Sequence, residues 1–288
     1  MRSPRWISAV AGCCLAAAAH GACLGDAQVA ELAEKFFQRI PAPNPEGLSE
    51  PDAACTRAKF HGRLLQRYGA AIGYKAGLTN PAVQQRFGTD RPVWGRLYQG
   101  MLLADGATVP ATFGARALFE ADLLVRVKSA DVNRARTPMD VLEAIDQIIP
   151  FIELPDLVVE APPRLNGPAV GAINVGARLG VTGRPMAVPL YRAERYAVLN
   201  ALRDMQVILS DGGGAVLASG KGSDILGHPL QAVVWLVGAL ASEGLALQPG
   251  QLVSLGSFSP LLPPRPGLKA TLRYDGLPGA GTVSVAFE

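Results

Sequence analysis

The stretch "ALFEADLLVRV", residues 117–127, alternates as a β-strand does and carries two carboxylates near its middle. Side chains on a strand point alternately to opposite faces of the sheet. One face therefore holds only apolar residues, namely Ala117, Phe119, Ala121, Leu123, Val125 and Val127. The opposite face holds Leu118, Glu120, Asp122, Leu124 and Arg126. These residues predict a sheet that is apolar on one side and acidic on the other.

Two interpretations of the acidic face remain open. Glu120 and Asp122 are two positions apart, so their Cα atoms lie about 6.5 Å apart and both side chains point the same way. Composition alone favours a solvated face, but two carboxylates can also hold a hard cation when a third joins them. The candidate is Glu153 in "IIPFIELPDLVVE", residues 148–160. Its apolar neighbours would require a partner for the ionised carboxylate.

Length and composition narrow the class of protein. The 288 residues are 49% hydrophobic and include 32 Gly and 23 Pro, which favours many strands and tight turns over a helix bundle. The chain is long enough for one large domain, or a small part joined to a larger one. The net charge is only +3 and the basic residues are scattered, so the sequence predicts no nucleic-acid binding.

Residues 1–27, "MRSPRWISAVAGCCLAAAAHGACLGDA", have the layout of a secretory signal peptide. Two arginines precede an apolar run that is too short for a confident membrane span, and small residues follow it. We expect cleavage after Ala27, because cleavage after Ala22 or lipid attachment at Cys23 would put His20 at an unfavourable position. A periplasmic or secreted protein with no stable membrane span is predicted; the alternative is a cytoplasmic protein.

Cleavage after Ala27 would leave one cysteine in the mature chain. Cys13, Cys14 and Cys23 lie in the leader, and only Cys55 follows it. A single cysteine forms no internal disulfide, so the fold would depend on its hydrophobic core. We expect Cys55 to be a packing residue on the apolar side of a helix.

Residues 28–69 are predicted to form a small N-terminal helical part. Apolar residues recur at steps of three and four from Val29 to Ile40, which indicates an amphipathic helix. Ser49, with Asp52 three positions later, is predicted to cap a second helix that ends at Gly69.

Residues 70–288 alternate short apolar runs with Gly and Pro, which predicts a β-rich domain. A helix capped by Thr137 is expected over residues 137–149, and a second helix over 229–244 is apolar nearly all round, so we expect it to be buried. Strands are expected at 251–259, 268–274 and 281–288.

Common catalytic motifs are absent from the sequence. The segment "SGKGSD", residues 219–224, lacks the spacing of a phosphate-binding loop, and no G-x-S-x-G elbow is present. The whole chain has only three histidines, and one cysteine follows the leader, which argues against a zinc site of the Cys/His type.

Four blocks of sequence carry a resemblance to a known family. "IGYKAGLTNPAVQQRFGTDRPVWGRLYQGM" (72–101) resembles the signature region of the 2-keto-4-pentenoate hydratase family, within the fumarylacetoacetate hydrolase superfamily. "FEADLLVRV" (119–127), "GHPLQAVVWLVGAL" (227–240) and "GQLVSLGSFSPLLPPRPG" (250–267) match in the same order. The resemblance implies an α+β fold, a β-rich roll of mixed sheets with residues 70–288 as the catalytic domain.

The resemblance also implies a metal site. In the family, an acid-x-acid pair on a strand and a later Glu hold a divalent cation, which corresponds here to Glu120, Asp122 and Glu153 with Mg²⁺ or Mn²⁺. Most members have Glu at the second position, so the side chain of Asp122 is one methylene shorter than the usual ligand.

The resemblance further implies that Lys75 acts in the substrate pocket. Asn166 and Ser257 are additional substrate-binding candidates, although Asn166 lacks the Asp that precedes it in many relatives.

The implied reaction is the metal-dependent addition of water to a 2-hydroxy-2,4-dienoate, the enol of a 2-keto-4-pentenoate, as in the breakdown of aromatic compounds. The product is a 4-hydroxy-2-keto acid. The alternatives are decarboxylation of a 2-keto-dioate, C–C bond hydrolysis as in the wider superfamily, and non-catalytic binding of a small carboxylate by an exported protein. The family also implies a homo-oligomer.

Overall fold

The structure is a computed structural model that describes residues 22–288. Residues 1–21 of the expected leader lie outside the described residues. The helices are α1 (Asp26–Gln38), α2 (Glu50–Tyr68), α3 (Pro81–Arg86), α4 (Pro138–Ala144), α5 (Gly167–Ala172), α6 (Arg192–Asp204) and α7 (Gln231–Ser242). The strands are β1 (Ala71–Gly77), β2 (Val93–Tyr98), β3 (Leu102–Ala104), β4 (Ala107–Val109), β5 (Glu120–Val127), β6 (Ile145–Leu154), β7 (Leu179–Thr182), β8 (Met186–Ala187), β9 (Gln206–Asp211), β10 (Val216–Lys221), β11 (Leu252–Ser254), β12 (Lys269–Asp275) and β13 (Val283–Phe287).

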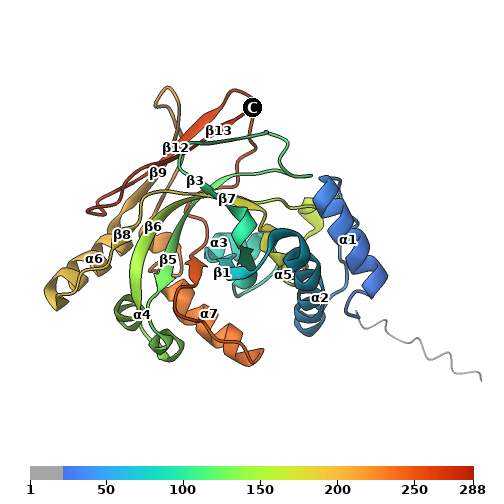
Figure 1. Ribbon diagram of the computed structural model, residues 1–288, viewed down its shortest axis with the longest axis horizontal. Coiled ribbons are helices and arrows are strands. Elements are labelled where there is room, and N and C mark those ends of the chain that lie inside the picture. Colours follow the sequence, from blue (N-terminus) through green and yellow to red (C-terminus); the bar gives the residue numbers. More distant parts are fainter. Residues whose placement is uncertain (1–21) are drawn as a thin grey trace, which may run out of the picture.

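The structure contains two mixed sheets, the larger one central and the smaller one along the upper edge of the molecule in Figure 1. The larger sheet has the order β2-β1-β11-β5-β6-β7-β3, with β8 paired to β6. The smaller sheet has the order β10-β9-β12-β13-β4. Each sheet contains both parallel and antiparallel pairs, such as β1 with β11 and β5 with β6. The predicted α+β class with mixed sheets is confirmed.

The apolar face of β5 packs into the main core, as its alternation predicts. Leu123 and Val125 join Ile152 of the same sheet and Leu272 and Val285 of the smaller sheet in one buried cluster. The opposite face of β5 is buried too, because Leu124 packs with apolar residues of neighbouring strands in a separate small cluster. A strand buried on both faces cannot leave its carboxylates in water.

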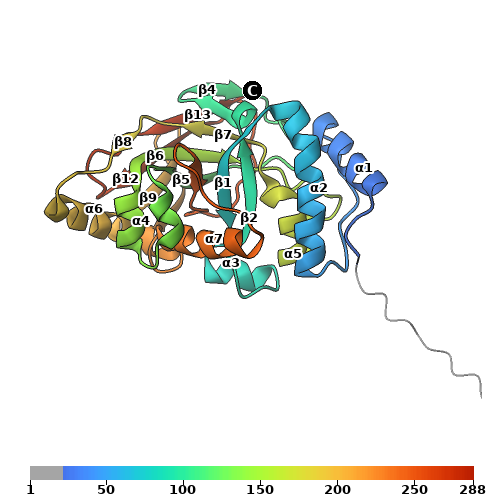
Figure 2. The same cartoon turned by 60° about the horizontal axis from the view of Figure 1, so that its bottom comes forward.

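The N-terminal helices form a layer at one end of the molecule, with α6 at the opposite end (Figures 1 and 2). Ser49 caps α2 in a reciprocal box with Asp52, and Gly69 follows its last residue, as predicted. Phe36 of α1 and Phe60 of α2 meet edge to face at 5.7 Å between ring centroids, within a core of their own that includes Tyr98 of β2. Both predicted helices are confirmed.

The helix expected over residues 137–149 is shorter than predicted. Thr137 and Asp140 form the expected capping box, but α4 ends at Ala144 and the chain enters β6 at Ile145. The β-branched residues of this segment are better accommodated in a strand paired with β5. The tertiary pairing therefore overrides the local helical pattern.

Two other helices depart from expectation. Helix α6 was not predicted, although its apolar side places Val198 and Leu202 in the core. Helix α7 is less buried than its composition suggested, because Val234, Trp235 and Ala239 are only partly covered. The three C-terminal strands are confirmed as β11, β12 and β13.

The prediction that Cys55 is an unpaired packing residue is wrong. Cys55 forms a disulfide with Cys23, which the expected cleavage after Ala27 would remove. That cleavage would also fall inside α1, which begins at Asp26. The domain boundaries at residues 27 and 69 stay predictions. Within residues 22–288, no helix combines the length and hydrophobicity needed to cross a membrane.

Candidate active site

The pairing of β5 with β6 brings the three predicted carboxylates together. Glu120 and Glu153 are direct partners in this antiparallel pair, and Asp122 lies two residues further along β5 on the same face. Directly opposed residues have Cβ atoms about 4.5–5.5 Å apart. The strand register therefore places three acidic side chains on one face of two adjacent strands.

All three carboxylates are buried. The exposed fractions are 8% for Glu120, 0% for Asp122 and 2% for Glu153, so the solvated-face interpretation is wrong. Burial, reinforced by the charge of Glu153, raises the pKa of Glu120 well above its usual range and that of Asp122 to about 8. A buried acidic cluster of this kind requires a cation to stabilise its ionised form.

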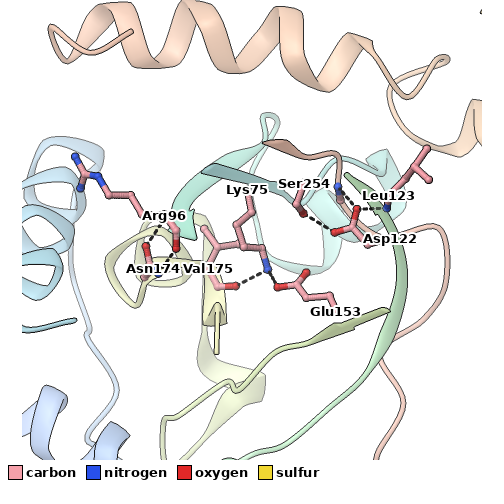
Figure 3. A network of polar contacts seen from close by, with 9 residues as sticks. Lys75, Arg96, Asp122, Leu123, Glu153, Asn174, Val175 and Ser254 are labelled. Atoms are coloured by element: carbon pink, nitrogen blue, oxygen red, sulfur yellow. Dashed lines mark hydrogen bonds and ion pairs between the residues drawn. The ribbon is translucent and has the colours of Figure 1, made fainter. Parts of the chain in front are cut away.

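Lys75 supplies a positive charge to the cluster (Figure 3). It lies on β1 and is 2% exposed. Its ammonium forms a salt bridge with Oε1 of Glu153 and donates a hydrogen bond to the main-chain oxygen of Val175 at 3.1 Å. The predicted pocket lysine is therefore a direct partner of a predicted metal ligand.

The carbonyl that receives Lys75 belongs to a turn with unusual backbone geometry. Asn174 and Val175 have φ angles of 56° and 55°, in the left-handed region that β-branched residues rarely adopt. The Asn174 side chain stabilises this turn against β2: its Oδ1 accepts from the main-chain N–H of Arg96 at 2.7 Å, and its Nδ2 donates to the Arg96 oxygen at 3.0 Å. Strain of this kind is found where the surroundings determine a functional position.

Asp122 is held by three hydrogen bonds (Figure 3). Its carboxylate accepts from Ser254 Oγ at 2.5 Å, from the Leu123 N–H at 2.6 Å and from the Gly256 N–H at 3.1 Å. Ser254 and Lys75 are register partners in the parallel pair of β11 with β1. The side chain of Asp122 is therefore directed toward β11.

Sequence reasoning missed Ser254 and Tyr274. Ser254 is a polar residue inside an apolar strand, a signal that was available in "QLVSL". Tyr274 on β12 donates its hydroxyl proton to the Asp122 main-chain oxygen and accepts from the Phe151 N–H at 3.1 Å. Both hydrogen bonds join the smaller sheet to the larger one next to Asp122, and no sequence pattern indicated them.

A cavity of about 360 Å³ lies beside the cluster. Lys75, Thr79, Arg86, Glu120, Ser257 and Phe258 are among the residues that line it. In residues 22–288, the only buried side-chain polar atoms without a hydrogen-bond partner are Thr79 Oγ1 and Glu153 Oε2, and both belong to this site. Buried polar atoms are normally paired, so these two atoms indicate a ligand.

Two predicted polar residues differ in their relation to this cavity. Ser257 lines it. Asn166 does not, since its Oδ1 caps α5 by accepting from the Ala169 N–H at 3.0 Å. Neither His61 nor His228 is among the lining residues, so no histidine of residues 22–288 can act as a base in the cavity.

In residues 22–288, no three acidic, histidine or cysteine side chains are arranged as ligands of one ion. Glu153 is engaged by Lys75, and Asp122 by Ser254. The donor set nevertheless fits a hard divalent cation, because it provides three carboxylates and the Glu153 Oε2 atom has no partner.

No family model matches the sequence. Among curated proteins, the chain is 29% identical to 4-oxalocrotonate decarboxylase of Pseudomonas putida over 258 residues, 90% of this chain and 92% of the relative. It is 27% identical to 2-keto-4-pentenoate hydratase of Paraburkholderia xenovorans (strain LB400) over 267 residues, 90% of this chain and 94% of the relative.

A solved structure agrees with these relatives. The 4-oxalocrotonate decarboxylase of Pseudomonas putida G7, complexed with magnesium and adipate, superposes with a TM-score of 0.77 at 27% identity, covering 93% of this chain and all of the other. The same enzyme is also solved with calcium and acetate. These matches identify the chain as a homologue of the 2-keto-4-pentenoate hydratases and 4-oxalocrotonate decarboxylases of the fumarylacetoacetate hydrolase superfamily.

Proposed function

We propose that this protein is a divalent-metal-dependent lyase that adds water to a 2-hydroxy-2,4-dienoate and releases a 4-hydroxy-2-keto acid. The observation that carries the proposal is the buried face of Glu120, Asp122 and Glu153, which adjoins Lys75 and a cavity of about 360 Å³. Homologues named as hydratases of such substrates support it.

Glu120, Asp122 and Glu153 would hold the cation, Mg²⁺ or Mn²⁺. When bound, such an ion supplies a positive charge that binds the carboxylate and C2 oxygen of a 2-keto acid and stabilises the negative charge of its enolate. The carboxylates themselves set the position of that charge, because two strands of one sheet fix them.

Lys75 would act on the substrate. Lys75 pairs with Glu153 and also lines the cavity, so its ammonium could hold the substrate carboxylate or donate a proton to a carbon of the dienol. Ser257, which also lines the cavity, would bind the substrate through its hydroxyl. Asn166 would contribute through α5, which it caps and whose Val170 lines the cavity.

Decarboxylation of a 2-keto-dioate is the second candidate, and Arg86 favours it. Arg86 lines the cavity and makes no ion pair with any described carboxylate. A free guanidinium is suited to a second carboxylate, which the dioate has and the simple dienoate lacks.

Turnover of two substrates tests both candidates. Purified protein would receive 2-hydroxypenta-2,4-dienoate with Mg²⁺ or Mn²⁺, and loss of the ultraviolet absorbance of the dienol would be followed. A parallel assay with 4-oxalocrotonate would measure release of CO₂. Metal-dependent loss of absorbance that disappears in Glu120→Gln supports the hydratase. Release of CO₂ with no hydration supports the decarboxylase, and turnover of neither substrate contradicts both.

We also propose that the protein is exported to the periplasm or secreted, because residues 1–27 have the layout of a signal peptide. Fractionation of cells that express the full chain tests this, and a full-length protein confined to the cytoplasm contradicts it.

Self-association is a further proposal. Leu190 and Tyr191, which precede α6, are 80% and 74% exposed, and apolar side chains grouped in this way favour a protein interface. Light scattering of the wild type and of Leu190→Ser tests it, because only the wild type should have the mass of an oligomer.

A further inference from the structure

The first described residues are attached to helix α2. Cys23 is bonded to Cys55, with 5.7 Å between their Cα atoms. The N–H of Leu24 donates to Thr56 Oγ1 at 3.0 Å, and Lys59 Nζ donates to the Leu24 oxygen at 3.0 Å. Two consecutive residues that precede α1 are therefore fixed by one covalent and two hydrogen bonds.

Leu24 also contributes to the packing. Its side chain lies against a small buried cluster of Leu48, Ala53 and Ala172, which joins α2 to α5. Thr56 is completely buried, so its hydroxyl would lose the N–H donor of Leu24 if this residue were removed. An apolar contact and a satisfied buried hydroxyl thus both depend on the residue next to Cys23.

A mature chain that began at Gln28 would lack these features. It would lose Cys23, Leu24 and the N-cap of α1 at Gly25. It would also lose Asp26, the first residue of α1, whose carboxylate forms a salt bridge with Lys59 at 2.9 Å. A chain that begins at Cys23 keeps all of these interactions.

We propose that the mature protein begins at Cys23, despite the unfavourable position of His20 in cleavage after Ala22, and that Cys23 and Cys55 form a structural disulfide. The inference is independent of the catalytic activity proposed above and rests on the proposed export, since exported proteins meet an oxidising environment. The disulfide excludes lipid attachment at Cys23, because a thioether to the lipid would use the same sulfur atom.

The disulfide forms by exchange with a disulfide donor, such as an oxidised dithiol protein or oxidised glutathione. The thiolate of one cysteine attacks the donor, and one donor thiol leaves. The thiolate of the other cysteine then attacks the mixed disulfide and displaces the second donor thiol. Cys23 and Cys55 each lose one proton, two electrons pass to the donor, and the donor becomes two thiols.

The disulfide should stabilise the N-terminal layer. It joins the segment before α1 to α2 across a separation of 32 residues, and these helices pack side by side (Figure 2). A disulfide restricts the unfolded chain and so favours the folded state. The N-terminal layer should therefore be more stable after oxidation than before it.

Mass spectrometry of the processed protein tests the proposal directly. The full chain would be expressed with its leader, purified without reductant and subjected to N-terminal sequencing and alkylation. We expect the sequence to begin at Cys23, with no alkylated thiol before reduction and two after it. A chain that begins at Gln28 or carries lipid on Cys23 overturns the proposal but leaves export intact. A chain that begins at Met1 with free thiols overturns both.

Matched variants test the stabilising role. Cys23→Ser and Cys55→Ser should each lower Tm by about 5–10 °C, and the double variant should lower it no further. Dithiothreitol should lower the Tm of the wild type by a similar amount and have no effect on the variants.

Cys13→Ser, a change within the leader, is the control and should leave the mature protein unaltered. Additive losses in the double variant, or a wild-type Tm that does not respond to reductant, would overturn the proposal. Failure to turn over any substrate would bear only on the catalytic proposal.

Discussion

Glu120 and Glu153 face each other across β5 and β6, so that two carboxylates distant in sequence are direct neighbours inside the protein. Two buried like charges destabilise a fold unless a cation accompanies them. Lys75 is the cation that the structure provides. The stability of the protein without metal should therefore depend on this lysine.

The substitution Lys75→Met tests that dependence. It retains the length of the side chain but removes its charge, and loss of one partner of a buried ion pair costs about 3–5 kcal/mol. The free energy of unfolding in urea should fall by this amount without metal, and Mg²⁺ should restore part of it. The control is Lys35→Met on the surface of α1, which should change stability little. Equal stability of Lys75→Met and the wild type would contradict this role.

The position of Asp122 should depend on Ser254. The substitution Ser254→Ala removes the donor at 2.5 Å from the buried Asp122 carboxylate. A buried acceptor that loses its partner costs about 1–3 kcal/mol. Calorimetry should show weaker Mg²⁺ binding together with this loss of stability. Ser242→Ala, on the exposed end of α7, is the matched control, and equal effects of the two substitutions would argue against a specific contact.

Asn174 should control turnover without binding metal. The substitution Asn174→Ala removes both hydrogen bonds to Arg96, so the Val175 carbonyl should move away from Lys75. We expect kcat to fall about tenfold or more, because positioning errors are costly in catalysis. Mg²⁺ affinity measured by calorimetry should change little. Parallel losses of metal affinity and kcat would indicate a general loss of structure instead.

Arg86 should increase the affinity of the protein for dicarboxylates but not for monocarboxylates. A charge-assisted hydrogen bond contributes about 1.5–3 kcal/mol, equivalent to roughly 10–100-fold in affinity. The substitution Arg86→Gln should weaken adipate binding by that factor and leave acetate binding nearly unchanged. Arg164→Gln, which alters a surface ion pair with Glu46, serves as the control. An unaltered adipate affinity would remove the support for a dioate substrate.

His61 should make stability depend on pH. Burial and the nearby charge of Arg96 lower its pKa from 6.5 to about 4 in the folded protein. Between these values the unfolded chain binds a proton that the folded protein does not, so stability falls as pH is lowered from about 6.5 toward 4. Because His61 is only half-buried, we expect a loss of about 1–2 kcal/mol.

The substitution His61→Asn should remove this part of the pH dependence while retaining a polar side chain next to Tyr98. Urea unfolding of both proteins at pH 7.5 and pH 4.5 measures the difference. A contribution from His228, whose pKa burial also lowers, is common to both proteins and cancels. Identical pH dependence in the two proteins would exclude His61 as the source.

Local patterns predicted much of this fold because they act over a few residues. The Ser49–Asp52 capping box and the alternation in β5 specify structure without help from the rest of the chain. The strand-like run from residue 148 was predicted, but the start of β6 at Ile145 was not, because pairing with β5 outweighs the helical signal of α4. Sequence can indicate which faces are apolar, but not which strand lies opposite.

The site was predictable only in part for the same reason. The spacing of Glu120 and Asp122 gave their common face, and the family resemblance added Glu153 and Lys75. Burial of the acidic face depended on neighbours in β6 and β11 that no local pattern identifies. The disulfide was missed because the presumed leader cleavage removed Cys23 from consideration.

The arrangement of the carboxylates also constrains folding. If β5 paired with β6 one residue out of register, Glu120 and Asp122 would turn into the apolar core between the two sheets. A misaligned sheet would thus bury two charges among aliphatic side chains, at a cost that no nearby cation relieves. Glu120 and Asp122, which we propose as metal ligands, therefore also disfavour incorrect strand pairing. A chain that folds stably should consequently have β5 and β6 in the register that brings the three carboxylates together.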